Sequence, residues 1–327
     1  MSTFEVKNAY ISQRCVVGGR LECEGPLGNF IDYQFYPNED SFESSELNMV
    51  KLCLDKLPIE KVDLIIAGDL SNQIAISSYS AKNINKPMLG IYAACATINE
   101  GIGIAAMLLE QQEINDVLVF TSSYNQTAER QFRSPVEYGG ERCDTQTFTS
   151  TIAAACIITN RKTKVKINRV TYGKVIDIDF KNAMDFGRCM VPAAIESILE
   201  HLHNTNTIPS DYDLILTGDL SSCGEPIVKE ELIKKYGNVD NYQDSGLILF
   251  DVDKQKVFAG GSGPGTIAAV LLSYVYPKLE NGTFKRVLIC ATGALMNPIM
   301  SNQKRSIPSI CHVIELGGVL WYIYTLF

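Results

Sequence analysis

A turn of small residues around Cys95 is the first place where this sequence could carry chemistry. The turn Ala93-Ala94-Cys95-Ala96-Thr97 stands between an apolar, strand-like run and a helix-like run. Small neighbours permit a tight turn that exposes a nucleophile, and the N-terminus of a helix lowers the pKa of a thiol. A buried cysteine at a tight packing point would have the same local sequence. The pattern therefore predicts either a nucleophile or a core residue at Cys95.

Two aspartates occupy a motif that the chain uses twice. Gly-Asp-Leu-Ser follows an apolar run at Asp69 and again at Asp219. Ligands of α/β sheets collect at the carboxyl ends of strands, which is where both aspartates are expected. An Asp or Ser in this position also commonly caps the helix that follows. Capping is the favoured interpretation for each aspartate taken alone.

A glycine loop and a long polar segment add candidate anion contacts. The loop Gly260-Gly261-Ser262-Gly263 could bring backbone N–H groups close to an anion. Residues 124–150 are predicted to be an insertion loop, in which Arg130 and Arg133 could present guanidinium groups to a carboxylate. Pairing with neighbouring glutamates, or use in a subunit interface, fits these arginines equally well.

The chain has three histidines. His201 and His203 lie two residues apart on a predicted helix and so face different directions. We expect both at the solvent or at the edge of the core. His312 is the remaining imidazole that could reach a site.

An internal repeat predicts the elements that position these residues. The segment Asp63–Ser71 reappears as Asp213–Ser221 with seven of nine positions identical. A strand, a small-residue turn, a helix and another strand are expected after each copy. In the second copy these include a strand at Leu247–Phe250 and a helix from Thr266 to Leu279. The pattern predicts two α/β halves, residues 1–165 and 166–327, related by a pseudo-twofold that sets Cys95 opposite Ser262.

Composition narrows the class of protein. The chain has 46% hydrophobic residues, which excludes global disorder, and a net charge of −8 without a basic cluster, which argues against nucleic-acid binding. Ten cysteines without a CxxC pair, together with three histidines, argue against zinc. With no signal peptide evident at the start, we expect a reducing cytosol.

Apolar stretches do not predict a spanning helix. The uncharged run Val257–Pro277 is interrupted by glycines and a proline, which leaves too short a helix for a bilayer. The tail Leu316–Phe327 is very apolar but also short. It could be a buried strand, an interfacial anchor or an abnormal terminus.

Several stretches together resemble a known family. They are Glu24–Gly28, Ala67–Leu70 with Asn72-Gln73, Ala94-Cys95, Thr127–Arg133, Glu137–Gly140, Leu216–Ser221, Phe258–Gly263, Ala291–Leu295 and Ser306–Pro308 with His312. On these residues the chain resembles the thiolase-like superfamily and, within it, the stage V sporulation AD family of endospore-forming bacteria. The tail after Glu315 does not resemble the end of that family.

The resemblance implies a fold and a role. The fold is α/β, thiolase-like, with two duplicated halves in a layered αβαβα arrangement. The role is binding of dipicolinic acid, possibly with calcium, during its uptake into the developing spore. A homodimer is expected, with membrane-protein partners encoded by the same stage V sporulation A operon. The expected location is the cytoplasmic face of the forespore or spore inner membrane, with peripheral association.

The resemblance also implies a binding site in the old active-site cleft, with no metal and no cofactor. Its expected contacts are Asp69, Asn72, Cys95, Arg130, Arg133, Asp219, Ser262, Gly263 and His312. Calcium should strengthen binding if the aspartates face the pocket and have no effect if they cap helices.

The partners that acyl transfer needs are missing from their expected places. Enzymes of the superfamily combine the cysteine with two histidines, or with a histidine and an asparagine. The corresponding loops here read Gly218-Asp219 and Gly261-Ser262-Gly263. An aspartate beside a thiol raises the pKa of the thiol. We therefore expect a non-catalytic binding protein. An acyltransferase that uses Cys95, or a scaffold with a vestigial pocket, are the alternatives.

Overall fold

The computed structural model describes residues 2–111, 113–132 and 142–318, which form two α/β halves with the same strand order. The first sheet runs β5 (Met88–Gly90), β4 (Leu64–Asp69), β6 (Asp116–Ser123), β8 (Ile152–Thr159) and β2 (Tyr10–Gly18). The second runs β11 (Tyr242–Asp244), β10 (Leu214–Thr217), β13 (Arg286–Ala294), β14 (Ser309–Gly318) and β9 (Val165–Thr171). In each sheet the first three strands are parallel and the fourth is antiparallel to both neighbours.

The two sheets join at one edge. β2 and β9 pair antiparallel there through Tyr10 and Ile11. Three short pairings complete the sheet structure: β1 (Thr3–Glu5) with β9, β3 (Tyr33–Gln34) with β2, and β7 (Phe148–Thr149) with β12 (Gly261–Ser262). The strand order confirms the duplicated architecture expected from the repeated motif.

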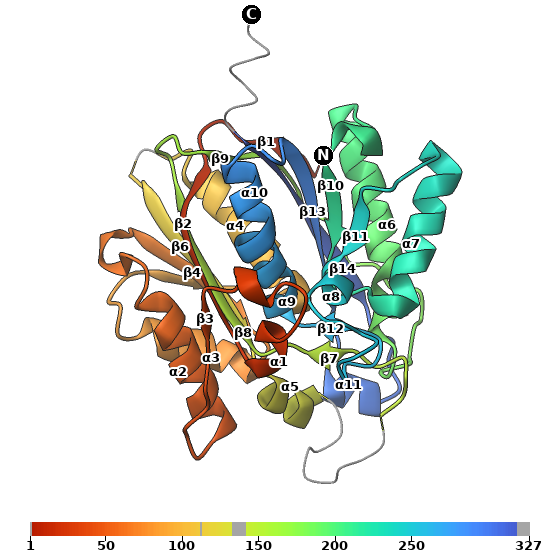
Figure 1. Cartoon of the computed structure of the whole chain (residues 1–327), viewed down its shortest axis with the longest axis horizontal. Helices are drawn as coiled ribbons and strands as arrows, with labels where there is room; N and C mark the ends of the chain where they lie inside the picture. The colour runs from red at the N-terminus through yellow and green to blue at the C-terminus, as the bar shows by residue number, and fades with distance from the viewer. Residues whose placement is uncertain (1, 112, 133–141, 319–327) are drawn as a thin grey trace, which may run out of the picture.

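Helices form three layers around the sheets (Figure 1). One outer layer is α2 (Phe42–Leu54) with α3 (Ala75–Ala81), and the other is α6 (Phe186–Thr205) with α7 (Ser221–Tyr236). The central layer holds α4 (Thr97–Leu108), α9 (Pro264–Ala269), the π-helical turns Val270–Val275 and α10 (Tyr276–Glu280). The short helices are α1 (Arg20–Cys23), α5 (Asn125–Phe132), α8 (Ser245–Ile248) and α11 (Pro298–Asn302). This is the layered αβαβα arrangement.

The central helices are apolar because both of their sides are covered. A Cβ added at Gly101 of α4 would lie 2.8 Å from Val119 of the first sheet, and one at Gly103 would lie 2.6 Å from Tyr172 beside the second. Glycine at these two positions lets α4 lie close to both sheets. The apolar run that begins at Pro264 is buried in the same layer. Within the described residues, no helix has the length and hydropathy that crossing a membrane requires.

Two expectations about local structure were wrong. Leu247–Phe250 is not a strand, since α8 occupies Ser245–Ile248 and the strand of the repeat is β11. The reason is Asp244, whose carboxylate accepts the amide of Gly246 at 3.1 Å and so begins a helix where the apolar letters suggest extension. The segment 124–150 is likewise not a loop throughout, because α5 forms at its start.

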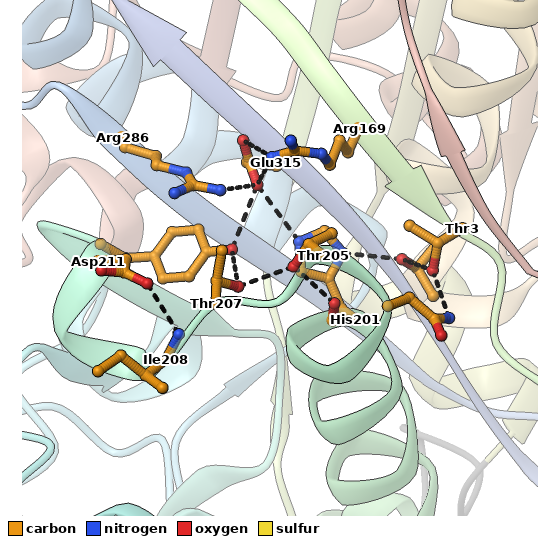
Figure 2. Close-up of polar contacts among 12 residues, drawn as sticks. Thr3, Arg169, His201, Thr205, Thr207, Ile208, Asp211, Arg286 and Glu315 are labelled. Carbon is orange, nitrogen blue, oxygen red and sulfur yellow. Dashed lines mark hydrogen bonds and ion pairs between the residues drawn. The ribbon is translucent and has the colours of Figure 1, made fainter.

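A buried ion cluster fastens the second sheet to α6 (Figure 2). Glu315 on β14 is 1% exposed, and its carboxylate accepts hydrogen bonds from Arg286 at 2.7 Å and from Arg169 at 3.2 Å. Tyr212 donates a third at 3.2 Å, and Nε2 of His201 lies 3.5 Å from the same oxygen. Burial alone would raise the pKa of Glu315, but His201 and the two arginines outweigh it and lower the pKa to about 2.

His201 belongs to this cluster, and so its expected place at the solvent or the core edge was wrong. The imidazole is fully buried, with Nδ1 2.8 Å from the hydroxyl of Thr171. Burial lowers the pKa of His201, which makes it a neutral hydrogen-bonding group. His203, two residues on, is exposed as expected.

Candidate functional site

Cys95 lies in a strained turn between β5 and α4. The turn Ala94–Ala96 is a 3-10 helix that leads directly into α4, and Ala94 has a φ of 49°. A residue other than glycine in this left-handed region is held there by its surroundings. Gly293 at the end of β13 is part of them, since a Cβ there would lie 2.2 Å from the carbonyl oxygen of Ala93. The bare glycine lets the turn press against the second half.

Ser262 and Asp219 from the second half meet Cys95. The Sγ of Cys95 lies 3.8 Å from the Oγ of Ser262, which confirms the predicted opposition across the pseudo-twofold. The amide of Gly263 donates to Oδ2 of Asp219 at 2.8 Å. Gly263 has a φ of 107°, and a Cβ there would lie 2.9 Å from the Oγ of Ser123, so this contact also requires glycine.

The electrostatics of this group favour neutral side chains. Burial, and after it Asp219, raises the pKa of the Cys95 thiol well above its usual range. Burial also raises the pKa of Asp219 well above its usual range, against the opposing effect of the Cys95 and Gly263 hydrogen bonds. Oδ1 of Asp219 is buried without a hydrogen-bond partner among the described residues. Burial therefore disfavours both the thiolate of Cys95 and the carboxylate of Asp219.

Two adjacent cavities lie near Cys95, which lines the inner one. The inner pocket has a volume of about 40 Å³ and is lined by Leu70, Tyr92, Ala94, Cys95, Phe132, Thr149, Phe186, Met190, Ser262, Ala294 and Met296. The outer groove has a volume of about 670 Å³ and is lined by residues 70–74, 90–92, 131–132 and 295–299. Leu70, Tyr92, Phe132 and Met296 line both, and so the two cavities are adjacent.

Asp69 is a capping residue and not a pocket residue. Its two carboxylate oxygens accept the amides of Ser71 at 2.8 Å and of Ser77, in α3, at 2.7 Å. It is fully buried and lines neither cavity. The capping interpretation of the first Gly-Asp-Leu-Ser motif therefore holds for Asp69. The second motif differs, because Asp219 bonds across to Gly263 of the other loop.

Arg130 and two amides of the glycine loop, which were predicted as anion contacts, make contacts within the protein. Arg130 forms an ion pair with Glu43 and lies over the ring of Phe42 at 5.4 Å. Both partners are on α2, so the guanidinium group is directed at that helix. The amide of Gly260 donates to the carbonyl of Val257, and that of Gly263 to Asp219, which leaves neither for a ligand. Arg133 lies outside the described residues.

His312 is in the core beside β9 and not in the cleft. Its Nδ1 accepts the amide of Gly173 at 3.3 Å, and its ring meets that of Tyr172 edge-on at 5.4 Å. Burial lowers the pKa of His312 to about 4, so the imidazole is neutral. Asn72, in contrast, lines the outer groove as the resemblance implied.

The lining residues that sequence reasoning missed are mainly apolar. Phe186 and Met190 come from α6, Thr149 from β7, and Met296 and Ile299 from the segment after β13. Apolar residues in a predicted helix or loop are expected to be core residues, and the sequence does not indicate which of them line a cavity. Phe132 is the exception, because it stands in the same Thr127–Arg133 stretch that carries the resemblance.

Solved structures with this fold include a 3-oxoacyl-[acyl-carrier-protein] synthase by name. A variant of OleA from Xanthomonas campestris superposes with a TM-score of 0.59 and 14% identity, covering 96% of this chain and 99% of that one. The 3-oxoacyl-[acyl-carrier-protein] synthase III from Aquifex aeolicus VF5 gives a TM-score of 0.55 and 13% identity, covering 94% and 99%. At such identities the similarity shows the thiolase-like fold alone.

Sequence comparison is far more specific. A sequence model of the family "Stage V sporulation protein AD (SpoVAD)" matches residues 2–317. Stage V sporulation protein AD of Bacillus subtilis (strain 168) is 39% identical over 321 residues, which cover 94% of this chain and 95% of that protein. This chain therefore belongs to the stage V sporulation protein AD family.

Proposed function

We propose that this chain binds dipicolinic acid without catalysing acyl transfer, and that binding serves the uptake of calcium dipicolinate into the developing spore. The observation that supports this most is Asp219 beside Cys95. A nucleophilic thiol needs a neighbouring base or cation, and here burial and an acidic group both keep it protonated. A protonated thiol and the hydroxyl of Ser262 are weak donors suited to holding a ligand.

The groove has the shape and chemistry for a small aromatic ring with carboxyl groups. Tyr92 and Phe132 supply aromatic surface to both cavities. Asn297 accepts the amides of Ile299 and Met300 with its oxygen, at 3.0 and 3.2 Å, so its NH₂ group is the end that can donate to a ligand. The inner pocket admits little more than one carboxylate, while the outer groove has room for the ring.

The charge of the groove supports a calcium chelate as the ligand. None of the described residues that line the outer groove carries a charged side chain. A bare dianion loses its hydration there without gaining a counter-charge, whereas a one-to-one calcium chelate is neutral. Asp69 caps α3 and is not exposed to the groove. We therefore propose that calcium enters as part of the ligand.

The alternative, acyl transfer by Cys95, is supported by one observation. The cysteine stands in a strained turn at the N-terminal end of α4, where a nucleophile would be placed. We expect that incubation of the purified chain with acyl-CoA yields no acyl adduct in the intact mass, because the thiol is protonated. An adduct that forms in the wild-type chain and disappears in Cys95→Ala would contradict the proposed function.

We also propose a homodimer that binds the membrane through partner proteins. β5 is the outer strand of the first sheet, with Leu89 43% exposed, and a free edge of this kind readily pairs with a second strand. We expect light scattering to give the mass of two chains, and Leu89→Lys to give one. A monomeric wild type would contradict this.

Membrane association without partners is not expected, since the chain is acidic. A chain ended after Gly318, the last residue of β14, should remain at the bottom of a liposome flotation gradient. Adding detergent-solubilised membrane proteins of the same operon to the vesicles should move it to the top. Flotation of the shortened chain on bare vesicles would contradict the need for partners.

A further inference from the structure

One wall of the outer groove is built from residues in a disfavoured backbone conformation. Gln73 has φ 58° and ψ 27°, and Ile74 has φ 50° and ψ 45°. Both are left-handed, neither is glycine, and the β-branched Ile74 is the more strongly disfavoured of the two. Such conformations persist only where surrounding contacts hold them, and they concentrate at ligand sites.

The loop Ser71–Ile74 is fixed at its base by Asp69 and along its side by Gln131. Asp69 accepts the amides of Ser71 and Ser77, which brackets the loop. Gln131 of α5 accepts the amide of Asn72 at 3.0 Å with Oε1 and donates to the carbonyl of Leu70 at 2.9 Å with Nε2. Both ends of a single side-chain amide are thus used on the loop.

The helix that carries Gln131 is itself anchored elsewhere. Thr127 of α5 donates to the buried carboxylate of Glu46 at 2.7 Å, and the same carboxylate accepts from Ser122 of β6 at 2.7 Å. Arg130 pairs with Glu43 of α2. These contacts fix α5 against α2 and the first sheet, so Gln131 connects a firmly held helix to a strained loop.

The position of the loop determines the shape of the groove. Ile74 packs on the bare backbone of β5, where a Cβ at Gly90 would lie 2.4 Å from Cδ1 of Ile74. Residues 70–74 and Gly90 all line the groove, as does Gln131 itself. We propose that Gln131 is a positioning residue that holds the strained loop Ser71–Ile74 as the ligand-contacting wall. This inference rests on the proposed function, because dipicolinate is the ligand that would contact this wall.

The test compares two variants of Gln131. Gln131→Ala removes both hydrogen bonds to the loop. Gln131→Glu keeps the acceptor for the Asn72 amide but replaces the donor to the Leu70 carbonyl with a second carboxylate oxygen. Gln126→Ala is the matched control, since Gln126 is on the same helix and the described residues show no side-chain hydrogen bond for it. Hydrogen exchange of the Ser71 and Ser77 amides in the free protein measures how firmly the loop is held. Both amides bond Asp69 and not Gln131, so their exchange is not changed by the loss of the Gln131 hydrogen bonds alone. Titration with calcium dipicolinate measures the affinity of the groove for the ligand.

We expect both Gln131 variants to speed exchange of these two amides and to weaken binding by about tenfold or more. Adding Gln73→Gly, which removes left-handed strain without altering the two hydrogen bonds of Gln131, should restore most of the exchange protection lost in Gln131→Ala. Gln126→Ala should behave as wild type.

Unchanged exchange in Gln131→Ala would overturn the proposal, and so would faster exchange with unchanged affinity. Failure of Gln73→Gly to restore the exchange protection would overturn the part assigned to strain. If the wild-type chain binds no dipicolinate, the proposed function fails, and the exchange measurement alone decides whether Gln131 holds the loop.

Discussion

Replacing Asp219 with histidine should convert Cys95 into a readily alkylated thiol. An imidazole in this position can take the thiol proton, and a cysteine paired with histidine has a pKa several units below that of a buried one. While the pKa stays above the pH, each unit of lowering gives about tenfold more thiolate. We therefore expect iodoacetamide at pH 7 to modify Cys95 about a hundredfold faster in Asp219→His than in the wild type.

Asp219→Asn is the matched control. Burial is the largest cause of the raised pKa of Cys95, and asparagine leaves that burial unchanged while it supplies no base. Asp219→Asn should therefore speed alkylation far less than Asp219→His. Peptide mapping is needed to separate Cys95 from Cys143, which is exposed. Equal rates in Asp219→His and Asp219→Asn would show that some other feature keeps the thiol unreactive.

Glu315→Gln should lower the free energy of unfolding by about 3 kcal/mol at pH 7, because it leaves Arg286 and Arg169 in a buried cluster without their counter-charge. Arg286 is the more buried of the two, with 14% of its side chain exposed. The pKa of Glu315, lowered from 4.5 to about 2, indicates a contribution of similar size. Urea unfolding followed by circular dichroism measures the loss.

The pH dependence of this effect has a definite sign. Because the pKa of Glu315 is lower in the folded state, its contribution is complete above pH 4.5 and disappears as the pH falls to about 2. The buried acids Glu22 and Glu46, with pKa values raised to about 7 mainly by burial, change stability in the opposite direction. The difference between wild type and Glu315→Gln isolates the cluster, and it should shrink between pH 5 and pH 2.5. A difference that stays constant over this range would contradict the assignment.

The fold could be predicted from the sequence because the two halves repeat the same motif and the same order of elements. Each Gly-Asp-Leu-Ser motif lies at the end of a strand, and the order of elements after each copy places Cys95 opposite Ser262 without any knowledge of long-range contacts. Position alone, however, does not distinguish two identical motifs. Asp69 caps α3, while Asp219 accepts the amide of Gly263 beside Cys95, and Gly263 is 44 residues from Asp219 along the chain.

The remaining misses share a physical cause. His201 looks like a residue of the surface or the core edge until β14 brings Glu315 beside it, with Arg169 and Arg286 on the same carboxylate. His312 resembles a site residue because histidine is rare in this chain, yet pairing of β14 with β13 places it in the core. Such contacts form between strands distant in sequence, and local pattern carries no information about them.

The central claim, that the cavity beside Cys95 binds dipicolinate, is tested most directly by isothermal titration of the full chain with calcium dipicolinate. The wild type should show saturable heat with one ligand for each chain, and the bare dianion should bind at least about tenfold more weakly. Ala294→Phe, which places a ring in an inner pocket of about 40 Å³, should abolish the heat while leaving the fold intact. An absence of saturable heat in the wild type would favour a scaffold with a vestigial pocket. Equal binding by Ala294→Phe would contradict the site.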